Sequence, residues 1–315
     1  MANRIKEKYM AGKRYFDYPM LFLVIFLICF GLVMIYSTSS YKSTVTYGNS
    51  YHWLLRQAVA IVLGAVAMVV CCKLDYRIIK SEKFGNGCYW ASIVLLVLVL
   101  IIGAAKKGAV RWISIAGFQF QPSEVSKILV VIYLANRLSA NAHKIRTFKD
   151  SIVIVLPTVP IIALIVTQNL STALVVCSMI GVMLFVVSPR MKELILTAGG
   201  GIILLFVYLL TANSYRNERV QIWLHPESHK KGFQTMQALY AIGSGGIFGK
   251  GLGQSMQKMG FIPESHNDMI FSIICEELGL FGAVCLILVF VALILRMLLI
   301  ALNTEDSFGS LVVIG

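Results

Sequence analysis

The sequence contains several stretches of about 20 apolar residues with almost no charge, and this feature limits the possible fold more than any other. A helix of that length crosses the hydrocarbon core of a bilayer. Only 14% of the 315 residues are charged, whereas a soluble domain has about 25%. The sequence therefore predicts an all-α fold, a polytopic transmembrane helical bundle, and excludes a soluble globular protein. The expected spans lie near residues 19–39, 54–72, 88–105, 125–140, 151–167, 170–187, 194–212 and 269–302.

The two ends of the chain add further expectations. Residues 1–17 are basic and lead into a long span without a cleavage site, so they are predicted to be a cytoplasmic segment. The span at 269–302 is overlong and contains Glu276, Glu277 and Arg296, so we expect it to bend or to begin at the interface. A ninth apolar run starts near Phe308 and stops after a few residues. We therefore expect about eight or nine spans, a truncated chain and one integral-membrane domain over residues 1–315.

Basic residues predict the orientation. Lys and Arg are more numerous in the segments that are cytoplasmic if the N-terminus lies inside, as the positive-inside rule requires. The short loop at 106–111 and the long loop at 213–268 then face outward, although both carry cations. Positive charge kept outside against the rule indicates an anionic ligand on that side.

The long outer loop contains a short apolar stretch, Met236–Phe248, followed by many glycines up to Gly253. The stretch is too short to span, so it predicts a re-entrant or interfacial helix that ends at glycines. The glycine run does not fit a Walker motif. Two uses stay open: backbone amides that approach a phosphate, or plain turns and helix packing.

Two groups of polar residues lie against apolar runs, where charge is costly unless it is paired or used. Glu264, His266 and Asp268 directly precede the last long span. Asp268 could simply cap that helix. Glu124 and Lys127 are spaced i, i+3 and so share a helix face. They predict either a structural salt bridge between helices or a substrate site.

Several motifs in this order resemble the SEDS family (shape, elongation, division and sporulation), which comprises the FtsW/RodA/SpoVE proteins. The resemblance covers essentially the whole chain, and the segment from Phe16 through the first span is most similar to the division branch. The motifs that carry it are Gly31–Ser37, Arg111–Ile113, Gln121–Lys127, Tyr215–Arg219, Gln237–Gly253, Pro263–Phe271 and Glu276–Gly279.

The resemblance implies a function. Members of this family polymerise lipid II, the undecaprenyl-pyrophosphate-linked disaccharide-pentapeptide, into glycan strands at the outer face of the bacterial cytoplasmic membrane. They act with a class B penicillin-binding protein that crosslinks the strands, and the division branch acts with other membrane proteins of the division machinery. The family has ten spans, so the last two are expected to be missing here. A nucleic-acid partner is not expected.

The resemblance also implies roles for individual residues. Asp268 matches the family's essential aspartate and is the expected general base. Glu264 and His266 are expected to orient the loop or to contact substrate. The expected partners of pyrophosphate or of peptide carboxylates are Lys127 (held by Glu124), Arg111, Arg216, Arg219 and Lys250. A divalent cation, Mg²⁺ or Mn²⁺, is a plausible cofactor, although the sequence contains no ligand cluster for it. Asn169 and Gln119 depart from the family pattern, which has an acidic and a basic residue there.

Two other functions remain as alternatives. A lipid II flippase would also need many spans, an intramembrane ion pair and outer cations, but it predicts a polar pathway across the membrane. Here the polar residues gather on the expected outer side. A non-catalytic scaffold of the division machinery predicts that Asp268 is dispensable.

Overall fold

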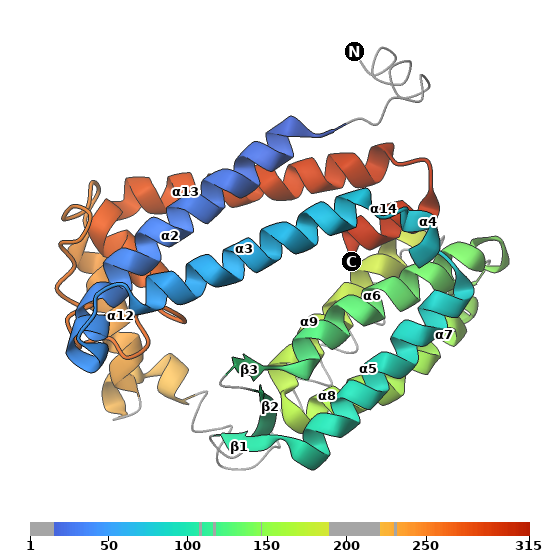
Figure 1. Cartoon of the computed structure of the whole chain (residues 1–315), viewed down its shortest axis with the longest axis horizontal. Coiled ribbons are helices and arrows are strands. Elements are labelled where there is room, and N and C mark those ends of the chain that lie inside the picture. The colour runs from blue at the N-terminus through green and yellow to red at the C-terminus, as the bar shows by residue number, and fades with distance from the viewer. Residues whose placement is uncertain (1–15, 107–108, 116–117, 146, 189–220, 230–231) are drawn as a thin grey trace. The chain divides into compact units, whose positions relative to one another are not determined.

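The structure is a computed structural model that describes residues 16–106, 109–115, 118–145, 147–188, 221–229 and 232–315. The chain forms two compact units (Figure 1). The first unit comprises residues 1–71 and 212–297, and the second comprises residues 72–211 and 298–315. The long helix α13 (Ile270–Asn303) runs from the first unit into the second.

The first unit is built from α2 (Tyr18–Tyr47), α3 (His52–Lys73), α12 (Phe233–Ser244) and most of α13. Asp17 begins α2, because its side chain accepts a hydrogen bond from the Met20 N–H at 2.9 Å. Gly48 ends this helix in the left-handed conformation that glycine adopts without strain. The helix therefore extends about two turns beyond the predicted end of the first span.

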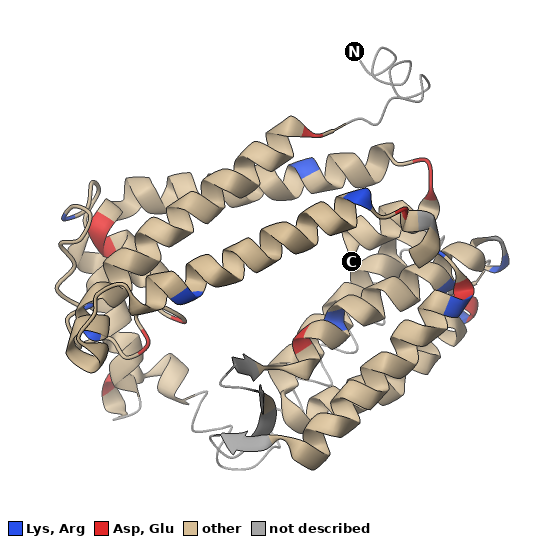
Figure 2. Ribbon diagram, viewed as in Figure 1, with Lys and Arg blue, Asp and Glu red and all other residues tan. Residues whose placement is uncertain are grey.

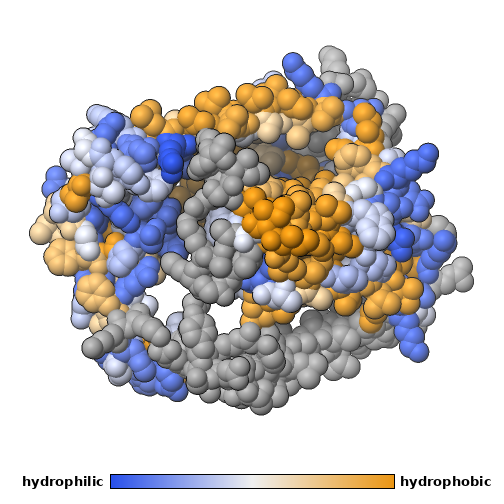
Figure 3. Space-filling view, turned by 60° about the horizontal axis from the view of Figure 1, so that its bottom comes forward, coloured by the Kyte–Doolittle hydropathy of each residue, from blue (hydrophilic) through white to orange (hydrophobic). Residues whose placement is uncertain are grey.

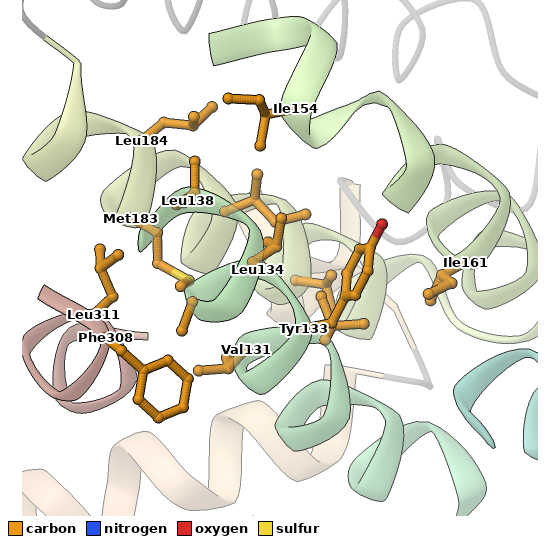
Figure 4. Close-up of a cluster of buried hydrophobic side chains, with 14 of the residues drawn as sticks. Val131, Tyr133, Leu134, Leu138, Ile154, Ile161, Met183, Leu184, Phe308 and Leu311 are labelled. Carbon is orange, nitrogen blue, oxygen red and sulfur yellow. The ribbon is translucent and has the colours of Figure 1, made fainter. Parts of the chain in front are cut away.

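The second unit surrounds a continuous apolar core (Figure 4). Val131, Leu134 and Leu138 project from one face of α6 and meet Met183 and Phe308 from other helices (Figure 4). The Lys80 ammonium bonds Asp306 at 2.7 Å just before the last helix begins. The helices of this unit are α4 (Tyr76–Ile79), α5 (Glu82–Ile102), α6 (Pro122–Ala140), α7 (Phe148–Val155), α8 (Val159–Gln168), α9 (Leu170–Val187) and α14 (Ser307–Ile314).

The predicted span at 151–167 is interrupted. α7 ends at Val155, a 3₁₀ turn covers Leu156–Thr158, and α8 follows. Pro157 lies in this turn, and its ring nitrogen cannot donate the hydrogen bond that a continuous α-helix requires. The two helices together still form one candidate span, residues 149–168.

A small antiparallel sheet replaces the outer loop that the sequence predicts at 106–111. β1 (Ala104–Lys106), β2 (Ala109–Ile115) and β3 (Phe118–Phe120) pair in the order β1-β2-β3. Ile113 pairs with Phe120, and Ile115 with Phe118. The alternation of these apolar residues with polar ones is the usual signal for a strand. The segment between α5 and α6 therefore contains strands that the sequence analysis did not predict.

Six helical segments among the described residues are long and apolar enough to cross a membrane: 18–47, 52–73, 82–102, 149–168, 170–187 and 270–303. Their surfaces carry many exposed large apolar side chains, as Figure 3 shows for one face. Charged residues lie mostly at helix ends and in loops (Figure 2). The prediction of an all-α membrane bundle is confirmed. α6 forms at its predicted place but is not one of the six, and the span predicted at 194–212 lies outside the described residues.

Candidate active site

A break in α13 organises the polar part of the first unit. Gly279 has φ 69° and ψ −170° inside this helix, so the helix consists of two halves, 270–278 and 280–303. The bend expected from the span's length is therefore confirmed. A break leaves backbone groups without helical partners, which is tolerated at membrane depth only where protein supplies new ones.

The glycine-rich loop supplies these partners. Lys250 and Gly251 donate backbone hydrogen bonds to the carbonyls of Glu276 and Glu277, each at 2.9 Å. In return, the N–H of Leu280 bonds the Gly246 carbonyl at 2.9 Å, and the N–H of Phe281 bonds the Ile247 carbonyl at 3.0 Å. The loop thus lies directly on the backbone of the broken helix.

Three glycines make this contact possible. A Cβ at Gly245 would overlap the Cys275 carbonyl, and one at Gly249 would overlap the Glu277 carbonyl. A Cβ at Gly279 would overlap the backbone of Gly249. The amides of Gly249, Lys250 and Gly251 are all taken by carbonyls of the chain itself. The observed use of this run is therefore helix packing, and these three amides are not free for a phosphate.

Two neighbouring carboxylates, Glu276 and Glu277, lie fully buried at the break, each with 0% of the residue surface exposed. Glu276 accepts hydrogen bonds from the Ser255 hydroxyl at 2.5 Å and from the Lys250 ammonium at 2.8 Å. Glu277 accepts from the Lys258 ammonium at 2.8 Å and from the Ser37 hydroxyl of α2 at 2.7 Å. Each buried carboxylate is thus paired with a cation, as burial requires.

These pairs change the interpretation of Lys250. The sequence predicts a contact with substrate phosphate or carboxylate, but in the structure the ammonium group bonds Glu276 and the Ser244 hydroxyl. Glu276 and Glu277 thus anchor the glycine-rich loop and the segment after it to α13. The partners Ser37, Ser255 and Lys258 were missed. The signal available for them was the high cost of two adjacent carboxylates within an apolar run.

Beyond Lys258 the chain returns to α13 and carries the polar motif. Ile262 packs against Ala241 of α12 and Ile273 of α13. The Ser265 hydroxyl donates to the Thr38 carbonyl at 3.3 Å. Two side chains therefore hold the segment against helices shortly before Asp268.

Asp268 itself is exposed and makes no hydrogen bond or ion pair with any residue that the structure describes. It does not cap α13: the helix begins at Ile270, whose N–H bonds the Asn267 carbonyl at 3.4 Å. The capping interpretation is therefore wrong in this structure. Among the described residues, nothing occupies the carboxylate of Asp268.

Glu264 has an unusual backbone. Its φ of 56° is the only positive value at a non-glycine position among the described residues. Its carboxylate accepts from the Asn267 amide at 3.0 Å and lies 3.9 Å from the Lys42 ammonium. Such strained conformations persist where their surroundings fix them, and they cluster at functional sites.

His266 is buried, with 7% of its surface exposed, and packs against Trp53 of α3 with ring centroids 4.7 Å apart. Neither ring nitrogen has a hydrogen-bond partner among the described residues. Burial lowers the pKa of the imidazole below its usual range, and the Lys42 charge lowers it further against the opposing effect of Glu264. His266 is therefore neutral at pH 7, with one nitrogen that can accept a hydrogen bond and one that can donate.

Glu124 and Lys127 lie in the second unit, where their side chains form an ion pair at 2.8 Å. Both belong to α6, so the pair does not join two helices. Arg111 lies on β2 of the same unit. Arg216 and Arg219 lie outside the described residues. Within the residues described here, no group of three or more His, Cys, Asp or Glu side chains could hold a metal ion.

The chain is similar to known proteins over most of its length. The FtsW/RodA/SpoVE family, described as "Cell cycle protein", matches residues 18–315. A "Probable peptidoglycan glycosyltransferase FtsW" from Geobacter metallireducens is 36% identical over 310 residues, which covers 95% of this chain and 81% of the relative. "Stage V sporulation protein E" from Bacillus subtilis is 35% identical over 309 residues, covering 95% and 82%.

Solved structures are similar as well. One, from work titled "Structural coordination of polymerization and crosslinking by a peptidoglycan synthase complex", has a TM-score of 0.75 at 26% identity and covers 96% of this chain and 83% of its own. The rod shape determining protein RodA of Thermus thermophilus has a TM-score of 0.66 at 26% identity, with 95% and 79% covered.

Proposed function

Because the chain belongs to the FtsW/RodA/SpoVE family, we propose that it is a peptidoglycan glycosyltransferase that polymerises lipid II into glycan strands. Similar proteins that are named probable peptidoglycan glycosyltransferases support this activity. The description of the family as a cell cycle protein supports a role in cell division. The reaction would take place at the outer face of the bacterial cytoplasmic membrane, with the N-terminus in the cytoplasm. That orientation follows from the distribution of Lys and Arg.

The main support for a mechanism is the exposure of Asp268 and its lack of a partner in the part of the chain that the structure describes. The carboxylate is exposed and unpaired among the described residues, just after a segment that Ile262 and Ser265 hold against neighbouring helices. Transfer joins the 4-hydroxyl of one sugar to the anomeric carbon of another. Asp268 takes the hydroxyl proton as the oxygen attacks, which is the work of a general base. The bond to pyrophosphate breaks with its electron pair, so one displacement inverts the anomeric centre.

The leaving undecaprenyl pyrophosphate is a stable anion, so it needs positive charge rather than an acid. We assign this role to Lys127, with Glu124 holding its ammonium group, and to Arg111, Arg216 and Arg219. Mg²⁺ commonly binds through one or two carboxylates together with substrate phosphates. A Mg²⁺ or Mn²⁺ ion here would therefore be held chiefly by the pyrophosphate. Glu264 and His266 keep the loop in place and offer polar groups to the sugar.

A class B penicillin-binding protein is the proposed partner, and it would crosslink the strands that this chain makes. The support is the similar structure whose title joins polymerisation to crosslinking in one synthase complex.

The test is polymerisation by the purified protein in complex with its crosslinking partner, supplied with labelled lipid II and Mg²⁺ or Mn²⁺. Glycan products are resolved on a gel for the wild type, for Asp268→Asn and for a control, Glu305→Gln, which alters an exposed carboxylate outside the site. We expect polymer from the wild type and the control and none from Asp268→Asn.

Each other outcome has a defined meaning. Equal polymer from Asp268→Asn and the wild type would remove Asp268 from the chemistry. No polymer from an intact wild-type complex, together with faster lipid II translocation across vesicles that contain the protein, would make it a flippase. If the complex shows neither polymerisation nor translocation, a non-catalytic scaffold is the function that remains.

A further inference from the structure

The ion pairs of the two buried glutamates place a lysine on each side of one short helix, with Lys258 buried and Lys250 exposed. Lys250 reaches Glu276, and Lys258 reaches Glu277, both at 2.8 Å. Consecutive residues on a helix point about 100° apart. Glu276 accordingly meets Ser244 of α12, whereas Glu277 meets Ser37 of α2. The segment from Lys250 to Lys258 therefore spans the half-helix 270–278.

This half-helix carries the carboxylates near one end and Asp268 just before the other. About two turns separate Asp268 from Glu276. Lys258 is the last loop residue that contacts the glutamates, and ten residues later Asp268 leads into the same half-helix. The loop is therefore attached to the half-helix near both of its ends. Gly279 lies at the far end, in a conformation that no helix shares. The half-helix and the loop consequently form one closed piece that is joined to the rest of α13 at this glycine.

Few apolar contacts hold the loop, whereas the half-helix itself buries Ile273 and Ile274. Of the loop residues 249–268, only Ile262 is a buried apolar side chain. The polar contacts are dense, because Ser255, Met256 and Gln257 also donate backbone or hydroxyl hydrogen bonds to Glu276 or Glu277. Ion pairs hold groups at fixed separations and directions, whereas apolar contact is non-directional.

We propose that the Lys258–Glu277 and Lys250–Glu276 pairs are positioning residues for the transfer reaction, which lock the loop and the half-helix together and thereby fix Asp268 against its acceptor. The proposal rests on the proposed function, in which Asp268 is the base. The four residues of these two pairs do not touch the reacting atoms. They act only through the place of the Asp268 carboxylate.

The test separates positioning from folding. Removing one partner strands a buried charge and destabilises the protein, but replacing both members of a buried pair by apolar residues is often neutral or stabilising. The informative variant is therefore Lys258→Met with Glu277→Leu. Its control is Arg296→Met with Asp17→Asn, which removes an ion pair with an N–O distance of 2.5 Å from the other half of α13. Asn at position 17 keeps an N-cap acceptor.

The variant and the control are each purified with the crosslinking partner, and a melting temperature equal to that of the wild type shows that they are folded. Two measurements are then made on both. In lipid II polymerisation we expect the Lys258/Glu277 variant to lose about tenfold or more in kcat, because small misplacements of a reacting group can cost 100-fold. Its KM should stay within about twofold, because substrate contacts remain. The Arg296/Asp17 control should match the wild type.

The second readout needs no activity. Hydrogen–deuterium exchange of peptides from 255–271 should be about tenfold faster in the Lys258/Glu277 variant and unchanged in the control, since exchange reports local opening. A variant with wild-type kcat, or with wild-type exchange across 255–271, would overturn the proposal. If Asp268→Asn polymerises normally, the proposed base is wrong, and the exchange result alone still decides whether the pairs fix this segment.

Discussion

Glu264 shows at the scale of one residue how the segment before Asp268 is held. Its left-handed backbone is unfavourable for a side chain with a Cβ, and its contacts with Lys42 and Asn267 lie on the surface. The sequence predicted that Glu264 orients the loop but not the strain. A positive φ at glutamate has no sequence signal, because the conformation depends on surroundings that are distant along the chain.

Substitutions at Glu264 should follow backbone preference rather than charge. Asn adopts the left-handed region readily, whereas a β-branched residue does not. We expect Glu264→Val to be less stable than Glu264→Asn by about 1–2 kcal/mol. Thermal unfolding in detergent, followed by tryptophan fluorescence, measures the difference. Equal melting temperatures for the two variants would show that φ at this position relaxes without cost.

His266 gives stability a pH dependence near neutrality. Burial, aided by Lys42, lowers the folded-state pKa, so the unfolded chain binds the proton more readily than the folded chain. The contribution is absent above the unfolded value of about 6.5, and stability falls as the pH drops below it. We expect the melting temperature of the wild type to fall between about pH 7 and pH 5.5.

The matched variant is His266→Phe, which keeps a ring against Trp53 but cannot titrate. Its melting temperature should change less over the same interval. The two other groups that influence the imidazole, Lys42 and Glu264, remain in both proteins. Parallel curves for the two proteins would mean that His266 does not contribute this dependence.

At the scale of elements, the long run at 269–302 illustrates what a sequence pattern can and cannot indicate. Its excess length and its charges predicted a bend, and α13 is indeed broken. The position of the break at Gly279 follows from the docking of Gly249 on the helix backbone. That contact joins two segments about 30 residues apart. The pattern within one helix therefore could not locate it.

Gly279→Ala is predicted to be severely destabilising. The added Cβ would overlap the backbone of Ile247 and Gly249, and φ is positive. We expect a loss of about 2 kcal/mol or more. Gly243→Ala is the control, because a Cβ there meets nothing within 4 Å and the position lies in α12. Alanine should stabilise that helix by up to about 1 kcal/mol. A tolerated Gly279→Ala would contradict the close docking.

At the scale of the whole molecule, the chain's low charge and long apolar runs were enough to predict a membrane bundle, because backbone polar groups must be satisfied internally in lipid. Low charge and apolar runs did not predict the small sheet at 104–120, because its strands are short and interrupted. It also could not assign Glu124 and Asp268 to two different units. Grouping into units depends on tertiary packing rather than on local periodicity.

The orientation in the membrane is a prediction for the whole chain. In a cysteine-free background, we expect Asn49→Cys, in the turn between α2 and α3, to react with a membrane-impermeant thiol reagent in intact cells. Ser81→Cys, between α4 and α5, should react only after the membrane is permeabilised. The opposite pattern would invert the topology and place Asp268 in the cytoplasm.

The contrast between α3 and α6 has a consequence for how the protein is made. None of the residues in α3 is buried, and its run is apolar enough to enter a bilayer alone. α6 carries Glu124, Lys127 and Arg137, and it is not among the helices that are apolar enough to cross a membrane. Its buried face belongs to the core that it shares with α5. We therefore expect α6 to leave the translocon only as a hairpin with α5, so that one step of biogenesis waits for tertiary contact.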